Sequence, residues 1–198
     1  MIKAVIFDAD GMLLTGEMFS KRLSKEYGID ENLIEPFFDT RFRDYIVVGK
    51  ADLKKEIKKY LGVWGWKRSL EELLTYWFQG NDLDLRVIEV IKKLRSQGIK
   101  CYLCTNQEKY RARYLINDLG FKSVFDNIFV SSFIGYKKPQ REFFEHVMRE
   151  LPEIKKGEIL FWDDREKYIE GAKKFGFKTE LYINFEGFRE KIKKYFNI

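Results

Sequence analysis

A chain of 198 residues can bury one substantial core, or one core with a small additional domain. Its apolar share of 45% is that of an ordinary globular protein, and no apolar run approaches the roughly 20 residues of a membrane-spanning helix. Asp8 and Asp10 interrupt the first apolar run, which argues against a signal peptide. We therefore expect a soluble protein of the cytoplasm that makes no membrane contact.

The net charge of +6 does not by itself indicate a nucleic-acid-binding protein. The lysines come in pairs on expected helices; Lys54 and Lys55, for example, lie opposite the apolar residues Leu53 and Ile57. The pairs stand among glutamates, and no zinc-finger spacing or helix-turn-helix signal accompanies them. We expect no nucleic-acid partner, only a modest attraction for small anions.

The first expected strand, Ile2–Phe7, leads directly into Asp8 and Asp10. Only helical patterns follow in residues 15–82, and from residue 83 onward strands and helices alternate. Alternation of this kind predicts an α/β fold, a doubly wound parallel sheet with helices on both faces. We predict a Rossmann-like core made of residues 1–14 and 83–198, with a small all-helical cap domain, 15–82, inserted after the first strand.

Three further expected strands end in polar groups. Ile99–Cys104 is followed by Thr105 and Asn106, Ile128–Val130 by a loop that contains Lys138, and Ile159–Trp162 by Asp163 and Asp164. Ligands of open parallel sheets bind beyond the carboxyl ends of the strands, so these groups are expected to meet Asp8 and Asp10 at one place. The collection suits a phosphate group and Mg²⁺.

The pair Cys101 and Cys104 has the C-x-x-C spacing of redox and zinc sites. On a strand, however, this spacing puts the two thiols on opposite faces of the sheet. Zinc would need four ligands, and the chain has only two cysteines and one histidine, His146. We interpret both cysteines as buried strand residues.

The spacing of Asp8 and Asp10 predicts a nucleophile and an acid–base. Residues two apart on an extended chain share a face, and two close carboxylates push one of the pair toward protonation. Ionised Asp8 would attack phosphorus, while protonated Asp10 would protonate the leaving oxygen and later take a proton from water.

The other groups fit the metal and the phosphate. Mg²⁺ prefers about six oxygen ligands, and Asp8 with Asp163 or Asp164 supplies carboxylates for it. Thr105 and Asn106 would donate hydrogen bonds to phosphate oxygens, and Lys138 would neutralise charge. Each motif alone is common in turns and helix caps, so the prediction depends on their combination.

These motifs resemble those of the haloacid dehalogenase (HAD) superfamily of phosphohydrolases, in the branch with a small helical cap after the first strand. The resembling stretches are Ala4–Gly11, Leu103–Gln107, Gly135–Pro139, and Leu160–Asp164 continuing to Gly171 and Ala172. The resemblance implies a sheet with the first strand at its centre, flanked by the second and the fourth. It also implies that the backbone carbonyl of Asp10 is a further metal ligand.

Three details qualify the resemblance. Dehalogenases of the family lack an aspartate two positions after the nucleophile, so Asp10 argues against dehalogenation. Met12 stands where many relatives have threonine, and Lys137 beside Lys138 leaves two ammonium groups for one site, although Pro139 favours Lys138.

The leading hypothesis is a Mg²⁺-dependent phosphatase that hydrolyses a small phosphorylated metabolite through an aspartyl phosphate, as a monomer or homodimer. A phosphomutase of the same family is the alternative; a phospho-accepting signalling domain or a pure binding module is a remote one. Arg41, Arg43 and Lys50 in the cap are candidates for a second anion contact, with solvated surface charge as the simpler explanation.

Overall fold

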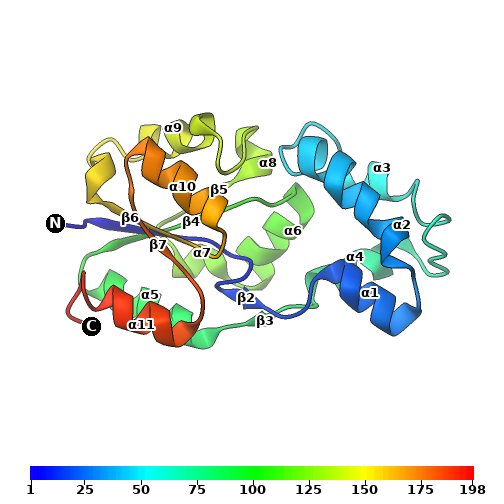
Figure 1. Ribbon diagram of the computed structural model, residues 1–198, viewed down its shortest axis with the longest axis horizontal. Coiled ribbons are helices and arrows are strands. Elements are labelled where there is room, and N and C mark those ends of the chain that lie inside the picture. Colours follow the sequence, from blue (N-terminus) through cyan, green and yellow to red (C-terminus); the bar gives the residue numbers. More distant parts are fainter.

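The computed structural model describes residues 1–198 and contains a five-stranded sheet with helices on both faces (Figure 1). The strand order is β5-β4-β1-β6-β7, and every pairing in this sheet is parallel. The strands are β1 (Ala4–Phe7), β4 (Lys100–Thr105), β5 (Asn127–Val130), β6 (Ile159–Asp163) and β7 (Lys178–Leu181). The predicted α/β class and the central place of the first strand, between β4 and β6, are confirmed.

The central strands β1 and β6 are buried along their whole length because helices cover both faces of the sheet. One face belongs to a core of 22 buried residues and the other to a core of 14. Cys101 lies in the first core and Cys104 in the second, and both are free thiols. The prediction that these cysteines are buried strand residues on opposite faces is therefore confirmed.

Two layers of helices enclose the sheet (Figure 1). The helices α5, α7 and α11 contribute to the larger core, and α9 and α10 contribute to the smaller one. The helical segments of this part are α5 (Leu85–Ser96), α6 (Lys109–Arg113), η2 (Tyr114–Asp118), α7 (Phe121–Val124), α8 (Ser131–Ile134), α9 (Arg141–Arg149), η3 (Lys156–Glu158), α10 (Glu166–Phe175) and α11 (Phe185–Ile192). His146 on α9 packs edge-to-face against Phe129.

The segment between β1 and α5 is mostly helical and has its own core of 13 buried residues. Its helices are α1 (Phe19–Tyr27), α2 (Glu31–Pro36), η1 (Phe37–Ile46), α3 (Leu53–Ile57) and α4 (Leu70–Phe78). Trp64, Trp66 and Trp77 all belong to this core, so they pack within the segment rather than line a pocket. The domain limits at residues 14/15 and 82/83 stay a prediction.

The chain crosses between the two parts through a small antiparallel ribbon that the sequence did not indicate. It consists of β2 (Leu14–Thr15) and β3 (Asp82–Leu83), paired as Leu14 with Leu83 and Thr15 with Asp82. Strands of two residues are too short to show an alternating pattern. The first and last residues of the segment 15–82 therefore belong to strands and not to helices.

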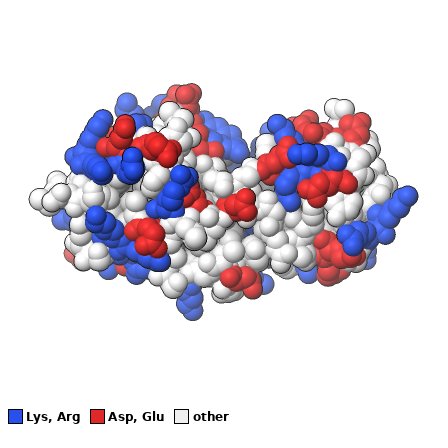
Figure 2. Space-filling view, turned by 90° about the horizontal axis from the view of Figure 1, so that it is seen from below, with Lys and Arg blue, Asp and Glu red and all other residues white.

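Basic and acidic side chains are interspersed on the face of the molecule in Figure 2, where a hollow separates the sheet-bearing part from the helical part. None of the helices is both long and apolar enough to cross a lipid bilayer.

The smaller core depends on Phe144 of α9, whose ring centroid lies 5.5–5.8 Å from those of Phe143, Phe161, Phe175 and Phe177. Phe144 is fully buried, so Phe144→Ala should lower the free energy of unfolding by about 3–5 kcal/mol through lost burial and a cavity. Urea unfolding measures this. The control is Ile183→Ala, whose side chain is 74% exposed and should cost little. Equal losses of unfolding free energy in Phe144→Ala and Ile183→Ala would contradict this account of the core.

Candidate functional site

Side chains from two strand ends and one loop meet at the carboxyl edge of the sheet. Asp8 follows β1, Asp163 ends β6 and Asp164 comes next in the chain. Carboxylate oxygens of these three residues all lie within 4.8 Å of one another. The structure therefore places the early and the late aspartates of the sequence in one cluster, which we call the carboxylate cluster.

Lys138 neutralises part of the carboxylate cluster. Its Nζ lies 2.8 Å from Oδ1 of Asp8 and 2.6 Å from Oδ2 of Asp163, and all three residues are buried. The ammonium also lies over the rings of Phe161 and Tyr168, at 5.6 and 5.2 Å from their centroids. Buried charges are stable only when paired, so this lysine and the two aspartates depend on one another.

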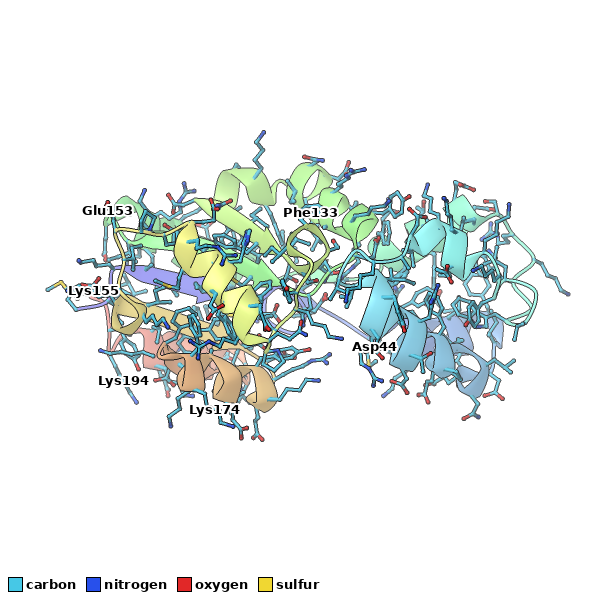
Figure 3. All side chains as sticks on the ribbon, turned by 90° about the horizontal axis from the view of Figure 1, so that it is seen from above. Asp44, Phe133, Glu153, Lys155, Lys174 and Lys194 are labelled. Atoms are coloured by element: carbon cyan, nitrogen blue, oxygen red, sulfur yellow. The ribbon has the colours of Figure 1, made fainter.

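Neighbouring residues fix which lysine enters the site. The Asn106 side chain accepts a hydrogen bond from the Lys138 backbone N–H (2.8 Å) and donates one to the Lys138 carbonyl (3.1 Å). Lys137 points away, toward the Arg43 carbonyl and the Asp44 carboxylate of η1. Figure 3 labels Asp44 on the edge of the helical part that faces the sheet-bearing part.

The carboxylate cluster holds more negative charge than Lys138 can balance. Burial raises the pKa of Asp8 to about 7 against the opposing effect of Lys138, and the Asp163 charge adds to the rise. Burial also raises the pKa values of Asp163 and Asp164. Oδ1 of Asp164 is buried without a hydrogen-bond partner. Three converging carboxylates with an unpaired oxygen fit a hard divalent cation such as Mg²⁺.

Gly11 allows Asp164 to reach the carboxylate cluster. Its φ of +79° belongs to the left-handed region, and a Cβ added here would lie 2.2 Å from Oδ2 of Asp164. The turn after β1 and the loop after β6 can approach each other this closely only because residue 11 has no side chain.

Asp10 lies outside the carboxylate cluster and pairs with a cation that sequence reasoning missed. The Arg111 guanidinium donates to both oxygens of Asp10, at 2.7 and 2.9 Å, and the Gln107 amide donates to Oδ2 as well. Burial alone would raise the pKa of Asp10, but these partners hold it below its usual value. Asp10 therefore pairs with Arg111 rather than sharing a proton with Asp8, and its role as the acid–base stays a prediction.

A signal for Arg111 did exist in the sequence. Arg111 stands four residues before Leu115, so a helix places it on the buried face. Glu108, not the Thr105–Asn106 pair, caps this helix by accepting hydrogen bonds from the backbone N–H groups of Tyr110 and Arg111. Thr105 is buried at the end of β4, and its phosphate contact, like that of Asn106, stays a prediction.

The three cationic candidates of the helical segment differ in their surroundings. Arg41 pairs with Glu56 at 2.8 Å, and Arg43 pairs with Asp44 at 3.2 Å, so both have partners within this segment. Lys50 lines a cavity of about 260 Å³ between the helical segment and the core, together with Phe133. In Figure 3 Phe133 lies near the boundary between the two parts.

A lysine-balanced carboxylate cluster at the carboxyl edge of a parallel sheet is suited to binding a divalent cation and an anionic group. The sequence model of the haloacid dehalogenase-like hydrolases matches residues 2–176, and the chain belongs to this family.

A curated relative is the sesquiterpene phosphatase astK of Aspergillus oryzae, 30% identical over 94 residues, which are 47% of this chain and 47% of that protein. The match thus spans about half the length of this relative. Among solved structures, an HAD family enzyme of Bacteroides thetaiotaomicron in its magnesium complex superposes with a TM-score of 0.81 at 20% identity, covering 97% of this chain and 98% of that one. A predicted HAD-like hydrolase of Porphyromonas gingivalis gives 0.78 at 22% identity, covering 98% of each.

Gly11→Ala should weaken Mg²⁺ binding, because the new methyl group displaces the Asp164 carboxylate. The measurement is the rise in melting temperature on addition of Mg²⁺, which reports binding to the folded protein. The control is Gly98→Ala, whose φ of +82° imposes the same backbone strain but whose Cβ meets nothing within 4 Å. The control should keep the Mg²⁺-dependent rise. An undiminished Mg²⁺-dependent rise in melting temperature in Gly11→Ala as well as in Gly98→Ala would contradict the placement of Asp164 in the metal site.

Proposed function

We propose that this hydrolase is a Mg²⁺-dependent phosphatase that hydrolyses a small phosphomonoester through an aspartyl phosphate on Asp8. The observation that carries the proposal is the position of Asp8, 2.8 Å from the Lys138 ammonium and within the carboxylate cluster. A nucleophilic carboxylate, a buried cation and a metal-binding set of oxygens at one point match the needs of phosphoryl transfer, which are positioning and charge neutralisation.

Each residue of the site has a role in this proposal. A carboxylate oxygen of Asp8 attacks phosphorus and the bond between phosphorus and the ester oxygen breaks. Asp10, protonated when the ester binds, gives its proton to the departing alkoxide and is left ionised. A water molecule then attacks the aspartyl phosphate while Asp10 takes up a proton. Lys138 neutralises charge near Asp8 throughout, with Thr105 and Asn106 as proposed phosphate contacts.

Magnesium, held by Asp8, Asp163, Asp164 and the backbone carbonyl of Asp10, would offset the repulsion between the anionic nucleophile and the anionic phosphate. The Bacteroides relative forms a complex with magnesium and inorganic phosphate, at a TM-score of 0.77 and 21% identity over 92% of this chain and 95% of that one. The name of the Aspergillus relative also describes a phosphatase. Both facts support the proposal.

A panel of phosphomonoesters, assayed with and without Mg²⁺, tests the function. We expect release of inorganic phosphate from several esters, dependent on Mg²⁺, and a fall of several orders of magnitude in Asp8→Asn. The matched control is Asp118→Asn, an exposed aspartate of η2, which should keep full activity.

Two outcomes would overturn the proposal. Equal turnover by the parent and Asp8→Asn would remove Asp8 as the nucleophile. Isomerisation of a sugar phosphate without release of phosphate would instead favour the phosphomutase.

A further inference from the structure

Beside the carboxylate cluster lies a second charged group, formed by Asp10, Arg111, Gln107 and Asn81. Arg111 comes from α6, which follows β4, whereas Asn81 immediately precedes β3. The group therefore joins the turn after β1, a helix of the sheet-bearing part and the chain that returns from the helical segment.

Arg111 is buried and has a single carboxylate partner at ion-pair distance. Its side chain is 6% exposed, whereas that of Asp10 is 44% exposed. Arg111 uses Nη1 and Nη2 on the two Asp10 oxygens, and Nε is buried without a partner. A two-point contact from a planar guanidinium fixes both the position and the rotation of a carboxylate, which a single ammonium cannot do.

Arg111 is in turn held by the crossing between the two parts of the molecule. Its Nη2 donates to Oδ1 of Asn81 at 3.1 Å, and the Asn81 amide donates to the Thr15 carbonyl of β2 at 3.3 Å. One continuous chain of hydrogen bonds thus runs from Asp10 to the β2–β3 ribbon.

We propose that Arg111 is the positioning residue for Asp10, fixing the orientation in which Asp10 exchanges a proton with the leaving oxygen and with water, and that Asn81 holds Arg111 in place. The inference rests on the proposed phosphatase function. Arg111 acts through Asp10 and makes no contact with the substrate.

The dependence on the leaving group separates this role from a purely structural one. An alkoxide is a strong base and needs a proton as it departs, whereas 4-nitrophenolate departs without one. The value of kcat/KM covers the steps up to departure of the leaving group. A residue that orients the proton donor therefore affects kcat/KM for an alkyl phosphate more than for 4-nitrophenyl phosphate.

The experiment measures kcat/KM for 4-nitrophenyl phosphate and for the alkyl phosphate that the parent hydrolyses fastest. Arg111→Gln and Asp10→Asn should each lower kcat/KM for the alkyl ester on the order of 100-fold. Both should lower kcat/KM for the aryl ester only a few-fold. Arg111→Lys, which keeps the charge but not the two-point contact, should show the same selective loss to a smaller degree. Asn81→Ala should also lower kcat/KM selectively for the alkyl ester, by less than Arg111→Lys does.

Arg149→Gln, at the exposed end of α9, is the matched control and should leave kcat/KM for both esters unchanged. If Arg111→Lys and Arg111→Gln lowered kcat/KM equally for the two esters, or did not lower it at all, the positioning role would be overturned. The phosphatase function would remain intact. A parent that hydrolyses neither ester would instead refute the phosphatase function, and the positioning role with it. Because Arg111→Lys retains a cation opposite Asp10, it keeps the test informative if Arg111→Gln does not fold.

Discussion

The placement of one ammonium group inside the protein is the constraint on which the site depends. Lys138 has no exposed side-chain area, and two carboxylates contact its Nζ. Removing a buried charge from its partners costs several kcal/mol, so each of the three groups requires the other two. The fold meets this requirement by bringing β1, β6 and the loop after β5 to one edge. The apolar core beneath the site thus carries charges that would be unstable separately.

The surrounding residues serve this charge arrangement. The Asn106 side chain holds the Lys138 backbone through two hydrogen bonds. Gly171 on α10 provides a further close contact, since a Cβ there would lie 2.4 Å from Cβ of Pro139, the residue after Lys138. The segment bearing the lysine is therefore confined by the loop after β4 on one side and by α10 on another. A small shift of either element moves a charge within a region of low dielectric, where electrostatic energies depend steeply on distance.

Much of the sheet could be predicted from the sequence because each buried strand is a continuous apolar run that ends in a polar pair. Asp8 and Asp163 were found in this way, since the rule that parallel strands end at a common edge needs no side-chain detail. Arg111 was missed because its role depends on a helix that packs against a turn about a hundred residues earlier in the chain. The pairing of Asp10 with Arg111 was missed for the same reason, because the spacing of Asp8 and Asp10 indicates a neighbour in sequence and not a partner in space. The β2–β3 ribbon leaves no sequence pattern at all.

The helical segment has a core of 13 buried residues that is separate from the two cores of the sheet. It joins the sheet-bearing part by two chain crossings and also touches it through polar contacts, such as that from the Ser131 hydroxyl to the Val47 carbonyl, 2.6 Å long, and the ion pair of Lys109 with Asp52. None of these 13 core residues belongs to the carboxylate cluster at the sheet edge. Because the buried aromatic side chains and the carboxylates belong to different clusters, the packing of the inserted segment can change without replacing any residue of the carboxylate cluster.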